Sequence, residues 1–156
     1  MAITKLVADS ITSGAIANTP AFSAIPSGSQ TITSGVDTLL NCATEIFDTD
    51  GAYDGTNKFT IPSGQDGKYF FNANLSMDSM YSTDIIIGTL AKNGTLDQTV
   101  RTRVIMAKDN ATITFNISGI VSAVAGDYFQ VYLSQNRGSD RTTNNTRSAF
   151  RGFKLI

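Results

Sequence analysis

The run from Tyr53 to Leu75 contains two strand patterns separated by a turn. Phe59 and Ile61 flank a threonine at strand spacing, and a Pro-Ser-Gly sequence ends that pattern. From Gly67 onward, alternate positions form one apolar face of a second strand, namely Tyr69, Phe71, Ala73 and Leu75. Phe70 points to the opposite, otherwise polar face, where a large aromatic side chain makes either a second-layer contact or an interface. The run therefore predicts a half-buried antiparallel sheet and makes Phe70 a candidate interface residue.

Similar strand patterns recur along the rest of the chain. Three consecutive isoleucines followed by Asn93-Gly94 predict a hairpin that returns over Val100 to Met106. In the next strand Gly119 interrupts a regular alternation, which predicts a bulge or a bend. We expect one longer strand over Thr38 to Phe47 and a loop over Met77 to Ser82.

Two tyrosines near the end of the chain lie on the polar face of a predicted strand. Phe129, Val131 and Leu133 form its core face, which leaves Tyr128 and Tyr132 outside. Tyrosines in line on one strand are common in protein interfaces, and they also form ordinary cross-strand pairs. Tyr128 and Tyr132 join Phe70 as candidates for a subunit interface.

The composition agrees with a single β-rich domain. The chain has 156 residues, 41% of them hydrophobic and 16% charged, with 13 glycines and 3 prolines. A net charge of -1 gives no field that attracts nucleic acid, and no apolar run is long enough to insert into a membrane. Cys42 has no partner for an intramolecular disulfide, so we expect a buried free thiol.

Residues 1–19 differ from the chain that follows, and we predict an N-terminal attachment arm there, with a head domain over residues 20–156. The arm either packs along a neighbouring protein or is a frayed terminus. Its candidate attachment residues are Ile3, Leu6, Val7, Ile11 and Ile16. No signal peptide pattern opens the chain, so we expect a virion component assembled in the host cytoplasm.

Catalytic chemistry has little support in the sequence. Histidine is absent, and no glycine-rich phosphate loop is present, so we predict a protein that is not an enzyme and binds no cofactor. Asp48, Asp50 and Asp54 begin like a calcium loop, but Phe59 stands where the closing glutamate is required. They are therefore weak metal candidates, and the alternative is that they accept hydrogen bonds from backbone N–H groups in turns.

Several segments in order resemble the globular head of complement component one, subcomponent q, and its tumour-necrosis-factor-like relatives. The resemblance covers nearly the whole chain after Thr19. The segments are PAFSA at 20–24, YDGTNKFTIP at 53–62, GKYFFNANL at 67–75, LAKNG at 90–94, AGDYFQVYL at 125–133 and SAFRGFKLI at 148–156.

The resemblance implies an all-β, two-sheet antiparallel jelly-roll sandwich of about ten strands, assembled as a homotrimer. It also implies that the first and last strands pair side by side. This sequence has no collagen-like stalk and no second cysteine, so it departs from the secreted members. The short arm in place of a stalk looks like the attachment segment of phage virion proteins that carry such heads.

The leading functional hypothesis is a phage structural protein. It would be a trimeric capsid decoration, or cement, or a short spike or fibre, held by its N-terminal arm to other virion proteins. The alternative is a receptor-binding module of a tail fibre, which recognises a host surface glycan or protein through loops such as Met77 to Ser82 and Gln135 to Arg147. A bacterial surface or matrix protein is a third possibility.

Overall fold

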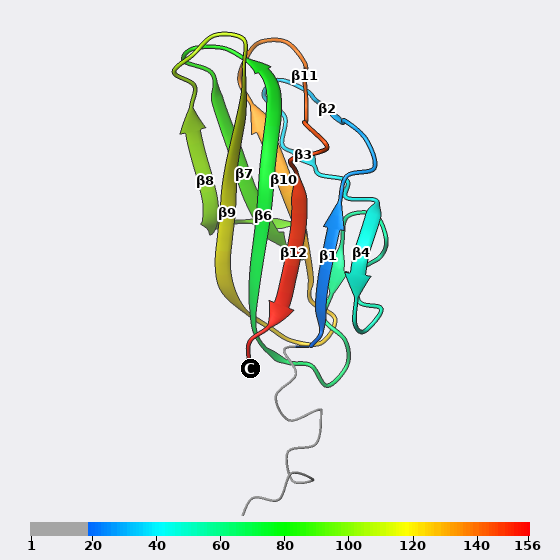
Figure 1. Ribbon diagram of the computed structural model, residues 1–156. Coiled ribbons are helices and arrows are strands. Elements are labelled where there is room, and N and C mark those ends of the chain that lie inside the picture. Colours follow the sequence, from blue (N-terminus) through cyan, green and yellow to red (C-terminus); the bar gives the residue numbers. More distant parts are fainter. Residues whose placement is uncertain (1–18) are drawn as a thin grey trace, which may run out of the picture.

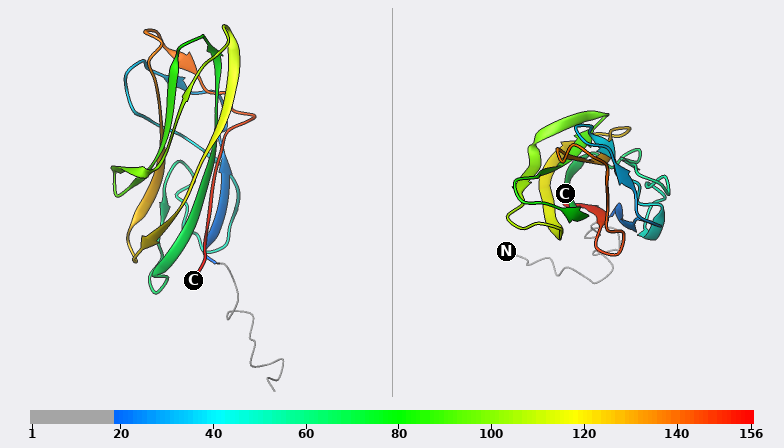
Figure 2. Two further views of the ribbon diagram at one scale, coloured as in Figure 1. Left: turned by 90° about the vertical axis from the view of Figure 1, so that its left-hand side faces the viewer. Right: turned by 90° about the horizontal axis from the view of Figure 1, so that it is seen from above.

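The computed structural model describes residues 19–156, and these form twelve β-strands with no helix among them. The strands pair antiparallel into two five-stranded sheets and one two-stranded sheet. Figure 1 shows the two larger sheets as the layers of an elongated sandwich, and Figure 2 shows the same layers from the side and from above. The described residues contain no helix long and apolar enough to cross a membrane.

The front sheet is the layer that faces the viewer in Figure 1, and its strand order is β4-β1-β12-β6-β9. Its strands are β4 (Thr44–Asp48), β1 (Ala21–Ile25), β12 (Ala149–Lys154), β6 (Gly67–Met80) and β9 (Ala111–Ala123). The first and last strands pair, with Ala21 opposite Phe153. This confirms the pairing that the resemblance implied.

The back sheet has the order β3-β10-β7-β8, and β5 also pairs with β10. Its strands are β3 (Thr38–Leu39), β10 (Tyr128–Gln135), β7 (Ile85–Lys92), β8 (Thr95–Ile105) and β5 (Phe59–Thr60). The hairpin between β7 and β8 turns at Asn93 and Gly94, which both have positive φ as this turn requires. A short sheet of β2 (Thr31–Ile32) and β11 (Arg141–Thr142) lies at one end of the sandwich.

Aromatic rings from both sheets fill the space between the layers. Phe22 stacks on Phe59 at a centroid distance of 4.5 Å and meets Phe150 edge-on at 4.9 Å. Phe71 lies 4.4 Å from Phe129 of the back sheet, and all these rings are buried. Because the rings come from both layers, burying them joins the sheets into one core.

Three local predictions are wrong. The stretch from Thr38 to Phe47 is divided, since β3 pairs with β10 in the back sheet and β4 pairs with β1 in the front sheet. Most of Met77 to Ser82 continues β6, whose irregular register lies between Met77 and Met80.

At Gly119 the β6–β9 pairing is continuous, and an added Cβ would lie 2.5 Å from Val100 Cγ2. Gly119 therefore makes room for Val100 and does not mark a bulge.

The sandwich has two distinct poles. Thr19, the first described residue, and the C-terminus lie at the basal pole, where Lys154 N donates to Pro20 O at 3.0 Å and Lys68 N donates to Ile156 O at 3.0 Å. The opposite, apical pole carries β2, β11 and the turn from β6 to β7. β6 alone has 14 residues, so the poles are about 45 Å apart at about 3.3 Å per residue.

Candidate functional site

The outer side of the front sheet carries a group of apolar side chains near the basal pole. Phe70 on β6 is paired with Phe153 on β12 and with Ile120 on β9, so the three side chains form a row across the sheet. The rings of Phe70 and Phe153 lie 5.6 Å apart, and Ile120 is 62% exposed. Phe47 on β4 adds a fourth apolar side chain that is 49% exposed. We call Phe47, Phe70, Ile120 and Phe153 the basal apolar patch.

An open hollow of about 530 Å³ lies within this patch. Phe47, Phe70 and Phe153 line it together with Arg151, and the Arg151 guanidinium donates to Ser23 Oγ at 3.3 Å. Apolar walls with one guanidinium at the side are typical of a protein contact surface, because such surfaces are enriched in aromatic residues and arginine.

The three sequence-based interface candidates do not lie together. Phe70 faces outward from the front sheet, whereas Tyr128 and Tyr132 face outward from β10 in the back sheet. The ring of Tyr128 lies under Lys58 Nζ at 5.5 Å, and Tyr132 is paired with Thr89 on β7. Both tyrosines are partly exposed, as Phe70 is.

Sequence reasoning missed Phe47, Ile120 and Phe153 as neighbours of Phe70. One signal was available for Phe153: it lies three positions after Phe150 on the same strand, so the two rings must face opposite sides of the sheet. No local signal places Ile120 or Phe47 beside it, because both are brought there by pairing with distant strands.

The aspartates of the predicted calcium loop are engaged with backbone groups. Asp48 Oδ2 accepts from Tyr53 N at 2.7 Å. Asp54 Oδ1 accepts from the N–H groups of Thr56, Asn57 and Lys58 at 2.9 to 3.0 Å, and these bonds hold the pKa of Asp54 below its ordinary value against the opposing effect of its desolvation. Within residues 19–156 no three His, Cys, Asp or Glu side chains converge on one point. The geometry is that of the turn alternative.

Cys42 is buried between the sheets. Tyr53 Oη donates to the Cys42 carbonyl at 3.0 Å, and burial raises the pKa of the Cys42 thiol to about 12. Burial also raises the pKa of Tyr53 and raises that of Tyr69 to about 12. A thiol with such a pKa stays protonated at neutral pH and is a poor nucleophile. Cys42 is therefore a core residue, as its sequence position indicated.

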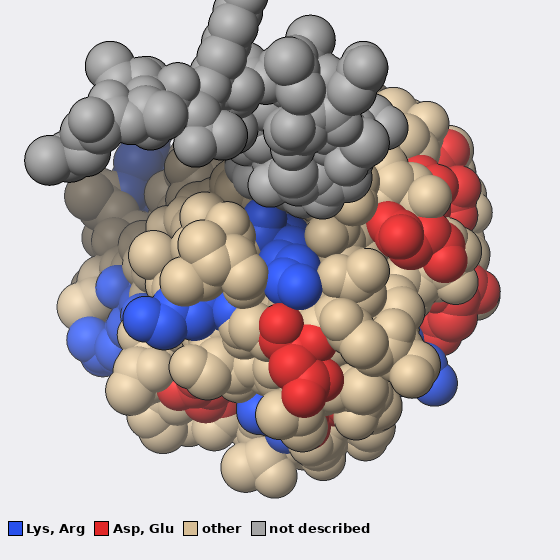
Figure 3. Space-filling view, turned by 90° about the horizontal axis from the view of Figure 1, so that it is seen from below, with Lys and Arg blue, Asp and Glu red and all other residues tan. Residues whose placement is uncertain are grey.

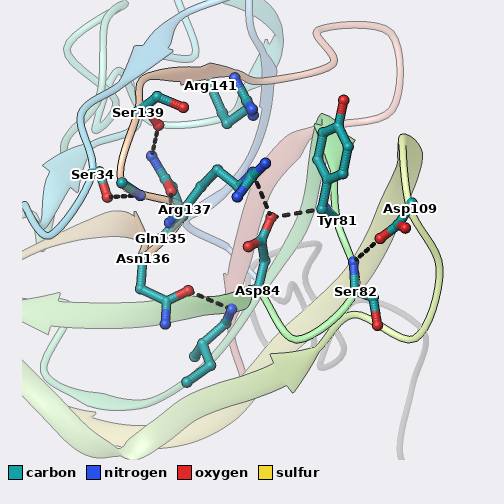
Figure 4. A network of polar contacts seen from close by, with 12 residues as sticks. Ser34, Tyr81, Ser82, Asp84, Asp109, Gln135, Asn136, Arg137, Ser139 and Arg141 are labelled. Carbon is teal, nitrogen blue, oxygen red and sulfur yellow. Dashed lines mark hydrogen bonds and ion pairs between the residues drawn. The ribbon is translucent and has the colours of Figure 1, made fainter.

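Both segments predicted as recognition loops lie at the apical pole. Asn144 Nδ2 donates to Asp78 Oδ2 at 3.1 Å, which joins the end of β6 to the segment after β11. Figure 4 shows the polar contacts there: Tyr81 and Asp84 come from the turn after β6, Arg137 comes from the segment between β10 and β11, and Arg141 is the first residue of β11. The predicted arm residues Ile3, Leu6, Val7, Ile11 and Ile16 lie outside the described residues.

Comparison with known proteins relates this arrangement to solved structures. No protein-family model matches the sequence, and no curated protein matches it. The globular domain of the zebrafish complement 1qA protein is 17% identical with a TM-score of 0.54, and the alignment covers 88% of this chain and 98% of that one. Two crystal structures of murine APRIL, at pH 5.0 and pH 8.5, are 11% and 10% identical, each with a TM-score of 0.61 and coverage of 86% of this chain and 98% of theirs.

The fold is a jelly roll like that of complement 1q and the tumour necrosis factor family. The expectation drawn from the sequence segments is thereby confirmed for the fold. In this complement-1q-like jelly roll, the segments at 20–24, 148–156 and 67–75 form the adjacent strands β1, β12 and β6. The segments at 53–62, 90–94 and 125–133 contribute to β5, β7 and β10, so the resemblance in sequence is shared between the two sheets.

Proposed function

We propose that this chain is the non-enzymatic head of a homotrimer that assembles through the basal apolar patch. The side chains of Phe47 and Ile120 are about half exposed, and Phe70 and Phe153 extend the apolar surface between them. A continuous apolar surface of this kind is costly in water and is normally covered by a partner. A heterologous contact that closes at three subunits would cover it in every copy.

We further propose that the trimer is a structural component of a phage virion, a capsid decoration or a short spike, attached through residues 1–19. Support comes from the polarity of the head, because the described chain begins at the basal pole, where the C-terminus also lies. Figure 3 views the basal pole from below and shows acidic side chains at the right and near the centre, with basic side chains at the centre and the left. Such mixed charge suits a contact with other proteins.

The experiment for the trimer is light scattering coupled to gel filtration, applied to the wild type and two variants. We expect three chains for the wild type and a monomer for Phe70→Asp, because the contact would bury an unpaired carboxylate. Tyr132→Asp on the back sheet is the matched control and should keep the mass of three chains. A monomeric wild type would contradict the trimer. If Tyr132→Asp dissociated the trimer and Phe70→Asp did not, the interface would lie on the back sheet.

A second candidate function is recognition of a host surface glycan or protein at the apical pole. The observation that favours it is the meeting of the turn after β6 with the segment between β10 and β11, on the pole farthest from residue 19. Loops on a rigid sandwich are the usual place for recognition. Binding of the head to host cells tests it, and the absence of binding across a host panel would contradict it.

A further inference from the structure

Two arginines meet one tyrosine ring at the apical pole. The guanidinium carbon of Arg137 lies 4.4 Å from the centroid of the Tyr81 ring, and that of Arg141 lies 5.7 Å from it. Figure 4 shows both side chains extending toward Tyr81 from the segment around β11. Cation–π attraction to the ring offsets part of the repulsion between two cations gathered at one place.

The two arginines of the cluster have a single ion-pair partner. The only carboxylate that pairs with either arginine within the described residues is Asp84, whose Oδ2 lies 3.6 Å from Arg137 Nε. The same oxygen accepts from Tyr81 N at 2.7 Å, so Asp84 is already used in holding the turn. Arg141 has no carboxylate within ion-pair distance in residues 19–156. Within the described residues, one of the two guanidinium groups is thus paired with a carboxylate and the other is not.

Hydrogen-bond donors of both arginines are left over. The Nε–H groups of Arg137 and Arg141 are buried and make no hydrogen bond within the described residues, although that of Arg137 faces the Asp84 carboxylate at 3.6 Å. Arg141 donates from Nη1 to the Asp140 carbonyl at 3.0 Å, which uses one of the several donors that a guanidinium carries. The Arg137 side chain is nevertheless 36% exposed, so the outer amino groups of its guanidinium remain available for charge-assisted hydrogen bonds to an oxyanion.

The segment that presents Arg137 is held in place before any ligand arrives. The buried Gln135 side chain accepts from Arg137 N at 2.6 Å and donates to the carbonyls of Ser139 and Ile32, each at 3.0 Å. Gly138 N donates to Ser34 Oγ at 2.8 Å, which ties the same segment to the strand region before β3. A preorganised loop lowers the entropic cost of binding.

The surroundings of the arginines favour a saccharide as the bearer of the oxyanion. Exposed amide and hydroxyl side chains lie beside the arginines in the same segment, namely Asn136, Ser139 and Thr142, and the exposed Asp140 directly precedes Arg141. An open hollow of about 240 Å³ adjoins the cluster through Asn136 and is lined by Arg103 as well. Neutral hydrogen-bonding groups around a cationic centre match sugar hydroxyls around an acidic group.

We propose that Arg137 and Arg141 bind the carboxylate or sulfate group of an acidic saccharide, with the Tyr81 ring holding both guanidinium groups in position. This site names a ligand class for the second proposed function, recognition at the apical pole. It rests on that proposed function only for its biological role. It does not depend on the trimer, because its residues belong to one chain and lie at the pole opposite the basal apolar patch.

The test is a calorimetric titration of the full chain at low ionic strength with three hexasaccharides. Hexagalacturonate supplies carboxylates, a heparin-derived hexasaccharide supplies sulfates, and maltohexaose is neutral. We expect binding of at least one acidic probe and none of maltohexaose. Arg137→Gln and Arg141→Gln should each weaken binding by at least about tenfold, because each removes charge-assisted hydrogen bonds.

Arg101→Gln is the matched control, since it removes the same charge from an exposed position on β8. It should change the affinity by less than about twofold, because with a net charge of -1 the whole protein attracts polyanions weakly. Equal affinity for all three hexasaccharides, or full binding by both folded apical variants, would overturn the proposal. Should the variants fail to fold, an NMR titration of the wild type decides: shifts at the backbone amides of residues 81–84 and 136–142 support the site, and shifts confined to other residues overturn it.

Discussion

Gly152 illustrates how a missing side chain permits the aromatic core of this protein. A Cβ at this position would lie 2.5 Å from Phe71 Cδ1 and 2.9 Å from Phe22 Cε1. Both rings are buried and are held by further aromatic contacts, so neither can withdraw without opening the core. The need for glycine here comes from space and not from backbone conformation.

Gly152→Ala should therefore destabilise the protein by about 1–3 kcal/mol, the usual cost of overpacking a close-packed core. The measurement is urea unfolding at matched protein concentration, since any assembly makes stability depend on concentration. Gly28→Ala is the control, because nothing lies within 4 Å of a Cβ there. Equal stability of the two variants would show that the rings at Gly152 move aside freely.

At the level of elements, a carboxylate joins the β7–β8 hairpin to the turn before β10. Asp127 pairs with Lys92 Nζ at 2.7 Å and accepts from Asn93 Nδ2 at 2.7 Å. Asn93 in turn accepts from Tyr128 N at 2.9 Å, so the hairpin is connected to the first residue of β10 by both side-chain and backbone groups. The hydrogen bond from Lys92, followed by those from Val124 N and Asn93, lowers the pKa of Asp127 to about 2.

This lowered pKa predicts a pH-dependent contribution to stability. Since the folded-state pKa lies below the ordinary value of 3.8, the contribution is present above about pH 4 and is lost as the pH falls toward about 2. Asp127→Asn should lower the free energy of unfolding by about 1 kcal/mol near neutral pH, because Lys92 is partly exposed and the pair is screened.

The check on Asp127→Asn is a series of urea unfolding curves between neutral pH and pH 2. The difference from the wild type should shrink toward zero at the acidic end. Asp37→Asn removes the same charge at an exposed position and is the control. A difference that stays constant over the whole range would mean that the Asp127 carboxylate is not the source of the effect.

At the scale of the whole molecule, the two poles are the basis of both proposals. The basal apolar patch lies entirely within the described residues of the front sheet, and Tyr81 of the apical cluster follows Phe70 of the patch by eleven positions, which is about 36 Å at about 3.3 Å per residue. Self-assembly and ligand binding would therefore use different surfaces of the same chain. Each surface can be altered by substitutions that leave the residues of the other surface unchanged.

Deleting residues 1–18 should leave a folded trimer, because the proposed contact needs only residues of the sandwich. Light scattering gives the mass of the shortened chain, and thermal unfolding compares its stability with that of the full chain. Three chains with an unchanged unfolding temperature would agree with a separate attachment role for these residues. A shortened chain that becomes monomeric would instead place part of the interface in residues 1–18.

The predictions from sequence succeeded where a local pattern decides the outcome. Alternation over β6 and β10 assigned their inward and outward residues correctly, and Asn93-Gly94 marked the hairpin. Of the surfaces proposed as functional, the sequence contributed Phe70 and the two apical segments. The partners of Phe70 and the meeting of Tyr81 with Arg137 and Arg141 could not be predicted, because they depend on contacts between distant parts of the chain.

The sequence by itself determined the β-class, the inward and outward faces of most strands, and the order of segments typical of this jelly roll. Side-chain alternation has a period of two, and it is readable from neighbouring residues alone. Only the tertiary structure decided which sheet each outward face belongs to. It divided 38–47 between two sheets and separated Phe70 from Tyr128 and Tyr132. Alternation distinguishes the two sides of a strand, but strand pairing across long sequence separations selects its neighbours, and those neighbours form the surfaces.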